Sequence, residues 1–226
     1  MFQSIKYAVL ATAILGSAAN AVVTVTVEAA GVQSNTQGQT GIVNFDAATT
    51  GVNTGLGVIF GTTGITGTID TVSILSNDLY GGAGVTGKYA SVLTNGTTTI
   101  TLGGTPASYF GFYASAIDGG GTVSIYNGTT LLYTKTLPLV ALDASYGGNP
   151  SSEGANPFQS YAFFNISSTT PFTSIVLTQA SGGASFEFDN LTIGTVPEPA
   201  SWALMIAGFA MVGFSMRRRA TKVVAA

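Results

Sequence analysis

The sequence predicts an all-β fold, an antiparallel β-sandwich of the jelly-roll type, and three observations favour it. Short runs of β-branched and aromatic residues recur along the chain and are separated by Gly, Asn, Pro and Ser. No convincing helical periodicity lies among these runs. The composition, with 30 glycines and 8% charged residues, is typical of exported β proteins. Strands at this spacing favour two packed sheets, and a closed barrel is the alternative.

The first 21 residues have the three parts of a secretory signal peptide. Lys6 supplies the charged region, Ala8–Gly16 is apolar, and the small residues Ala19 and Ala21 form the cleavage site for signal peptidase. A first helix of the domain is the competing interpretation, but a β-pattern begins directly at Val22. We therefore expect a signal helix at 1–21, cleavage after Ala21 and a domain that spans 22–194.

Within 22–194, eight runs of residues are predicted strands, and two polar stretches, Gly31–Gln39 and Gly147–Asn156, are predicted loops. The strands are Val22–Val27, Gly41–Phe45, Tyr109–Ala116, Thr122–Tyr126, Thr130–Thr136, Ser160–Asn165, Phe172–Thr178 and Ala184–Ile193.

Two of these predictions concern local pairing. Asn127-Gly128 suits a type I′ turn, so the strands that flank it are expected to form an antiparallel hairpin. In the last strand, apolar and polar residues alternate until the phase breaks at Asn190, which predicts a β-bulge or a strand that leaves the sheet.

Charge and composition exclude several classes of function. The segment Val22–Val196 holds two lysines and nine acidic residues, a net charge of −7, which makes nucleic acid an improbable partner. The chain has no His and no Cys, so disulfides, His-based triads and Cys/His zinc sites are excluded. A hydrolase would need two carboxylates across a groove, and no motif selects such a pair. We therefore expect no enzyme.

A structural calcium ion is the metal chemistry that the sequence allows. Asp46 follows an early strand, Asp189 lies on the predicted last strand, and oxygen donors of this kind suit Ca²⁺. The ending of the domain is similar to that of jelly-roll carbohydrate-binding modules, in which an early and a late strand meet at such an ion. The alternative is that Asp189 and Asn190 bond only to a neighbouring loop or turn.

Tyrosines are the candidates for stacking against sugar rings, although a tyrosine in a strand is more often half-buried in the core. The candidates are Tyr80, Tyr89, Tyr113, Tyr126, Tyr133, Tyr146 and Tyr161.

The C-terminal segment, residues 195–220, combines three features. Pro197, Glu198 and Pro199 precede an uncharged stretch at 200–216, which is at the short end of the roughly 17–25 residues that a transmembrane helix needs. Arg217, Arg218 and Arg219 follow, and by the positive-inside rule they stay in the cytoplasm with residues 221–226, while Trp202 lies at the opposite interface. A core helix is disfavoured because the stretch has no polar face. A permanent anchor is the remaining alternative.

These features, together with Ser201-Trp202-Ala203 and Met205–Phe209, resemble the PEP-CTERM sorting signal of Gram-negative bacteria in its Trp-Ala variant. The resemblance covers about 25 residues. It implies recognition by an exosortase, a membrane-embedded enzyme that processes the protein near Pro197–Pro199, with Glu198 and the two prolines as recognition residues.

The sequence therefore predicts a protein that is exported through the inner membrane, held there transiently by 200–216, and delivered to the cell surface or medium of a Gram-negative bacterium. The expected role is that of a non-enzymatic surface or matrix protein associated with exopolysaccharide or biofilm. The alternatives are a calcium-stabilised carbohydrate-binding module and a polysaccharide hydrolase.

Overall fold

The computed structural model describes most of the domain and a short segment after it. The described residues are 21–29, 31–36, 41–61, 64–78, 81–83, 87–117, 119–137, 160–195 and 205–214.

Twelve strands make up the described part of the domain, and every pairing among them is antiparallel. Their bounds are β1 (Val23–Val27), β2 (Gly41–Val43), β3 (Gly51–Ile59), β4 (Thr66–Ser76), β5 (Lys88–Leu93), β6 (Thr97–Gly103), β7 (Ala107–Ile117), β8 (Gly121–Asn127), β9 (Thr130–Thr136), β10 (Ser160–Phe172), β11 (Ser174–Gln179) and β12 (Ser185–Gly194).

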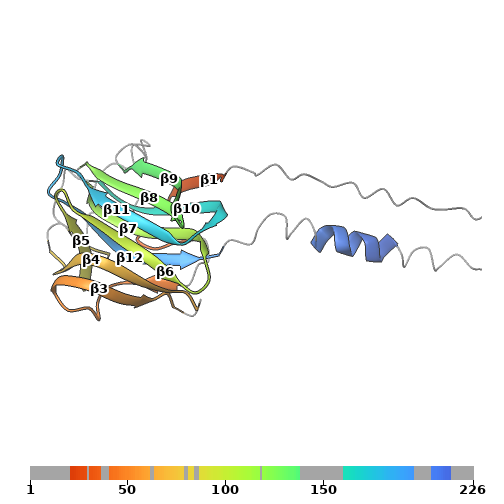
Figure 1. Cartoon of the computed structure of the whole chain (residues 1–226), viewed down its shortest axis with the longest axis horizontal. Helices are drawn as coiled ribbons and strands as arrows, with labels where there is room; N and C mark the ends of the chain where they lie inside the picture. Colours follow the sequence, from red (N-terminus) through yellow and green to blue (C-terminus); the bar gives the residue numbers. More distant parts are fainter. Residues whose placement is uncertain are drawn as a thin grey trace, which may run out of the picture.

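The strands form one continuous sheet rather than two separate ones. Their order is β1-β10-β7-β12-β5-β4-β6-β11-β8-β9, while β2 pairs with β12 and β3 pairs with β4 (Figure 1). The sheet curls so strongly that β10 contacts β8, near the other end of this order. The predicted all-β antiparallel class is confirmed, but the two-sheet sandwich is not, because β5 joins the two halves into a nearly barrel-shaped whole.

Large apolar side chains fill the space inside the curled sheet. Phe112 stacks between Phe110 and Phe164, with ring centroids 5.1 and 5.3 Å apart, and its ring meets that of Phe186 edge-on. All four rings are buried. Since a chain without disulfides must rely on its own core, this aromatic cluster is a main source of the stability of the fold.

The sequence-based strands agree with the structure after residue 108 and miss four strands before it. The antiparallel hairpin of β8 and β9 is confirmed, but its two turn residues are Gly128, with φ 58°, and Thr129, because Asn127 pairs with Thr130. The predicted type I′ turn at Asn127-Gly128 is wrong, since Asn127 does not have the positive φ that this turn requires. β12 has the expected irregularity, a register shift between Asp189 and Thr192. The four strands that the sequence did not predict are β3, β4, β5 and β6.

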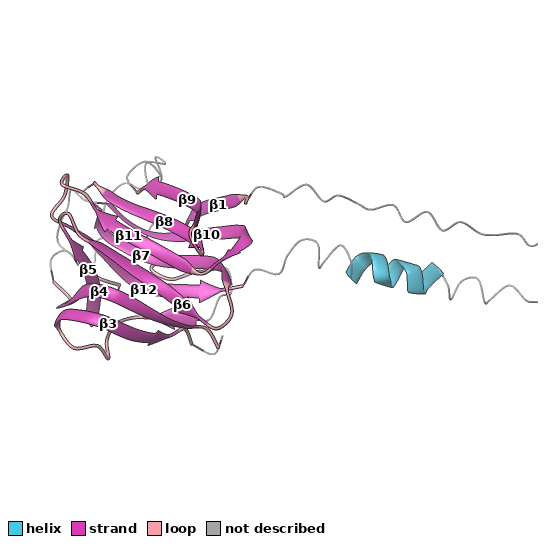
Figure 2. Ribbon diagram, in the orientation of Figure 1, coloured by secondary structure: helices cyan, strands magenta, loops and turns pink. Residues whose placement is uncertain are grey.

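One short helix follows the domain, at residues 205–214 (Figure 2). In the part of the chain that the structure describes, no helix reaches the length and apolar character needed to cross a membrane. The predicted transmembrane stretch 200–216 extends at both ends beyond the described residues.

The start of β1 and the end of β12 lie at the same end of the sheet. Register pairs Thr24 with Ser167, Ser167 with Tyr109, and Tyr109 with Gly194, so these four residues form one row across four strands. Neighbouring strands are about 4.8 Å apart, which separates Thr24 from Gly194 by about 14 Å. We call this end of the domain, with Val22, Gly41, Gly61, Thr169 and Gly194, the exit end.

Candidate functional site

The predicted processing sites flank the described domain. The cleavage residue Ala19 and the sorting residues Pro197, Glu198, Pro199, Trp202, Arg217, Arg218 and Arg219 all lie outside the described residues. Ala21 is described and comes directly before Val22, which is exposed and bonded to β10: its N–H donates to Thr169 Oγ1 (3.0 Å), and its carbonyl accepts from the Thr169 N–H (3.0 Å). Cleavage after Ala21 would leave the whole of β1 in place.

The end of β12 is held more firmly than the start of β1. Ile193 pairs with Phe110 on one side and with Gly41 on the other, and Gly194 pairs with Tyr109. Ile193 is fully buried. A Cβ on Gly41 would lie 2.7 Å from the carbonyl oxygen of Ile193, so glycine is needed for this close approach. The folded domain therefore continues to the residue before the predicted sorting segment.

Asp189 is buried at the bulge of β12. Its Oδ2 accepts a hydrogen bond from the Ala83 N–H (2.9 Å) and its Oδ1 from the Asn190 N–H (2.7 Å). Asn190 in turn donates from Nδ2 to the carbonyl of Gln33 (2.9 Å). These are the loop and turn bonds that the sequence analysis gave as the alternative to a metal site, and they fasten two loops to the last strand.

The pKa of Asp189 is raised to about 7, mainly by burial; the nearby carboxylate of Asp46 contributes to the rise, and the two backbone N–H bonds oppose it. The structure thus brings the two predicted calcium ligands close enough to interact through their charges.

Asp46 already has hydrogen-bond donors at both carboxylate oxygens. Lys88 N–H donates to Oδ1 (2.9 Å), and Asn44 Nδ2 donates to Oδ2 (2.9 Å). The Lys88 ammonium donates to the main-chain oxygens of Asp46 (3.0 Å) and Ala48 (2.6 Å). Among the described residues, no three or more acidic, His or Cys side chains gather in one place. The positive charge beside Asp46 is that of the Lys88 side chain.

The described tyrosines are mostly core residues. Tyr89, Tyr113 and Tyr161 are buried, whereas Tyr126 and Tyr133 are partly exposed. Tyr133 packs against the core, and Tyr126 alternates with the buried Ile125 and so lies on the outer side of β8. Tyr80 and Tyr146 lie outside the described residues. Tyr126 is thus the described candidate best placed to contact a sugar ring.

Tyr126 belongs to a broad surface that the sequence analysis missed, which we call the hydroxyl face. Ser and Thr side chains occupy alternate outward positions on five neighbouring strands, and register places them in rows across β9, β8, β11, β6 and β4. The residues are Thr66, Thr68, Thr97, Thr99, Thr101, Thr122, Ser124, Thr134, Thr136, Ser174 and Thr178.

Hydroxyl groups of the hydroxyl face are spaced by the sheet itself. They recur about every 4.8 Å across the strands and about every 6.7 Å along them. Some bond to one another, as Ser124 does to Thr134 (2.8 Å) and Thr97 to Thr178 (3.2 Å). These residues are uncharged, but two others interrupt the pattern: Val176 on β11 pairs with Thr99 and Ser124, and the exposed Asp70 follows Thr66 and Thr68 in the same alternation on β4. The alternation Thr97, Thr99, Thr101 was the signal in the sequence that could have revealed it.

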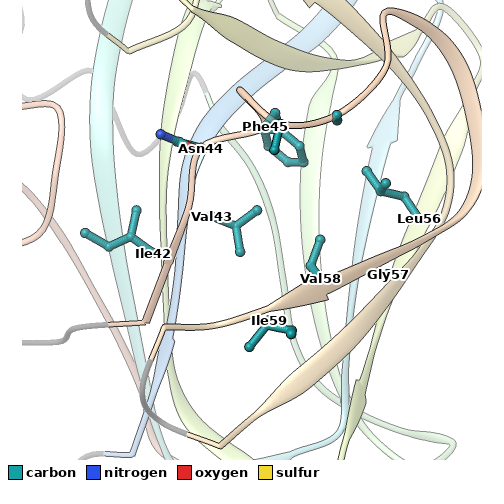
Figure 3. A pocket seen from close by; sticks show the side chains of 10 residues that line it. Ile42, Val43, Asn44, Phe45, Leu56, Gly57, Val58 and Ile59 are labelled. Carbon is teal, nitrogen blue, oxygen red and sulfur yellow. The ribbon is translucent and has the colours of Figure 1, made fainter.

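An apolar pocket of about 310 Å³ opens between β2 and β3. Figure 3 shows Val43, Phe45 and Val58 around it, and Ile59 at its rim is largely exposed. Among the described residues that line it, Asn44 supplies the polar side chain and none is acidic or basic, so these residues offer no group for acid–base or nucleophilic chemistry.

Comparison with known proteins identifies a sequence motif in this chain. No curated protein matches it, and no solved structure matches its fold. A protein-family comparison matches the PEP-CTERM protein-sorting motif over residues 195–219, immediately after the end of β12 at Gly194. The match begins one residue beyond the last strand and includes every predicted sorting residue. The chain thus carries a PEP-CTERM protein-sorting motif, which implies export, surface sorting and processing by an exosortase in a Gram-negative bacterium.

Proposed function

We propose that the protein is a non-enzymatic cell-surface or extracellular-matrix protein, sorted by an exosortase, whose domain associates with exopolysaccharide through the hydroxyl face. The sorting motif at 195–219 is the observation that carries the surface location. The hydroxyl face supports the association with polysaccharide.

A surface of this kind suits a neutral, hydroxyl-rich polymer for three physical reasons. Each Ser or Thr hydroxyl can donate and accept, so it can exchange its bonds to water for bonds to sugar hydroxyls. Apart from Asp70 at its β4 edge, this surface is uncharged, which limits the cost of burying an ion against a neutral chain. Tyr126 adds an amphipathic ring beside Ser174, its partner on β11.

The non-enzymatic role is supported by the placement of the described carboxylates. Asp189, with its raised pKa, would be the natural proton donor of a glycosidase. It is 2% exposed, however, and its two oxygens are already bonded to main-chain N–H groups, so a substrate could not reach it without displacing a loop.

The sorting part of the proposal is tested by the mass of the protein recovered from the surface or medium of its native host. We expect a mass that ends near Pro197–Pro199 for the wild type and an intact tail for Glu198→Ala. An intact tail in both proteins would instead identify a permanent anchor.

The polysaccharide part is tested by co-sedimentation of the recovered protein with exopolysaccharide from the same host. We expect Thr99→Lys, at the centre of the hydroxyl face, and Tyr126→Ala to weaken binding several-fold, because one places a charge against a neutral polymer and the other removes the ring. Thr49→Lys, an exposed position between β2 and β3, is the matched control and should bind like the wild type. Equal binding by all four proteins would exclude the hydroxyl face as the contact.

A further inference from the structure

The sorting motif leaves almost no linker between the folded domain and the residues that the exosortase must reach. β12 ends at Gly194, and only Thr195 and Val196 separate it from Pro197. A fully extended chain advances at most about 3.3–3.6 Å per residue, so Pro197 lies within about 11 Å of Gly194. An enzyme that binds this segment therefore meets the domain as well.

Peeling back the end of β12 to lengthen the linker would disrupt the domain. Leu191 and Ile193 are fully buried and pair with β2, and Ile193 and Gly194 pair with β7 on the other side. Release of this end would expose apolar side chains and break ladder bonds on both sides of a central strand. The folded form is thus the form in which the motif is presented.

The described surface around this point has no charged side chain. Val22, Gly41, Gly61, Thr169 and Thr195 surround the exit end, and the charge there is the α-ammonium group that Val22 gains when the signal peptide is removed after Ala21. The acidic groups Asp46, Glu187 and Asp189 instead lie toward the starting half of β12, and only the last residues of this strand reach the exit end. A surface with one positive group and no acidic side chain can approach a membrane-embedded enzyme without repulsion from a negatively charged membrane surface.

We propose that the exosortase cleaves the folded domain while the exit end is docked against the enzyme, and that the two-residue spacing from Gly194 to Pro197 enforces this contact. The inference rests on the proposed sorting function and adds a second recognition element to the motif. An anionic group at the exit end should therefore slow processing, and a longer spacer should remove the effect.

The experiment compares Thr169→Glu with Thr169→Gln in the full chain in the native host, by pulse-chase measurement of the processed fraction. Thr169 is exposed, and both variants remove its hydroxyl bond to Val22. They differ in the charge of the exit end, because the glutamate carboxylate cancels the positive charge of the Val22 α-ammonium group and the glutamine leaves it. We expect Thr169→Glu to be processed several-fold more slowly than Thr169→Gln. Inserting Gly-Ser-Gly-Ser between Thr195 and Val196 should make the two rates equal.

Two controls separate the possible failures. Ser181→Glu, on the exposed loop before β12 at the far end of that strand, should be processed like the wild type, and limited proteolysis of each variant checks the fold. Equal rates for Thr169→Glu and Thr169→Gln, or a difference that persists with the long spacer, would overturn the docking. Continued tail removal in Glu198→Ala would overturn the exosortase assignment itself, and the docking with it.

Discussion

At the residue scale, two kinds of position hold the fold together: glycines in crowded strands and polar groups that fasten loops. Glu28 is an example of the second kind. Burial raises its pKa, but hydrogen bonds from Thr36 and Asn165 outweigh this and leave the pKa below its ordinary value. Asn165 in turn accepts from the buried Tyr109 hydroxyl (2.5 Å), so one network joins the loop after β1 to β10 and β7.

Gly111 is the glycine at which a side chain should be least tolerated. A Cβ there would lie 2.5 Å from the Tyr109 hydroxyl and 2.8 Å from the Phe163 ring. We expect Gly111→Ala to lower the free energy of unfolding by about 1–3 kcal/mol, as overpacking of a core usually does. Gly57→Ala, on a strand with open space around the new methyl, should change it by less than about 0.5 kcal/mol. Urea denaturation measures both, and equal effects would contradict the crowding.

Asp189 should give the domain an unusual dependence on pH. Because its pKa is raised to about 7 in the folded state, the folded protein holds a proton that the unfolded chain, with the ordinary value of 3.8, releases. This contribution is complete below pH 4 and is lost as the pH rises through about 7. At about 1.4 kcal/mol per pKa unit, the loss amounts to up to about 4 kcal/mol.

The test is the free energy of unfolding between pH 4 and 8 for the wild type and Asp189→Asn. The variant cannot titrate, so the decline between pH 4 and 7 should be smaller than in the wild type. Asp70→Asn, at an exposed position on β4, serves as the control for the loss of a surface carboxylate. The same slope in all three proteins would show that Asp189 does not titrate in this range.

At the scale of elements, strands with regular alternation could be predicted and those with a broken phase could not. In β12 the alternation of Phe186 and Phe188 with polar residues is plain. In β4, the buried positions change parity between Ile69 and Val72, because the strand contacts β6 in its first half and β5 in its second. That partner change is a tertiary effect, so the apolar pattern of the strand hides its own period.

The sorting motif and the hydroxyl face also differ in whether the sequence alone could predict them. The sorting motif is a local pattern of residue types, and the sequence alone identified it. The hydroxyl face depends on the register of five strands, two of which the sequence did not predict. Its residues therefore could not be assembled without the structure.

The hairpin of β8 and β9 gives a prediction at this scale. Gly128 has φ 58° and open space around it, so only backbone strain opposes a side chain there. We expect Gly128→Ala to destabilise the domain by about 1 kcal/mol. Gly182→Ala, also in open space but without a positive φ, should be neutral in the same thermal unfolding experiment. If both substitutions were neutral, the turn would not be the feature that sets this register.

At the scale of the whole molecule, the domain is complete at Gly194 and the sorting motif begins just beyond it. Removal of the tail should therefore leave the thermal midpoint of the domain unchanged. The processed wild type and the unprocessed Glu198→Ala protein should unfold within about 1 °C of each other, since surface changes away from packing contacts have little effect on stability. A lower midpoint after processing would show that the tail contributes to the fold.

The exit of both chain ends from one side of the sheet has a further consequence for any layer that these proteins build. A molecule that is tethered at that side, whether by membrane or by matrix, has a fixed polarity, with the loop between β11 and β12 at the opposite pole. Many copies tethered in this way would share one orientation, with the exit end toward the tether. A peptide epitope inserted at Gly182 in that loop would then be accessible at the outer surface of the layer, and a peptide inserted near Gly61 would face the tether and be inaccessible.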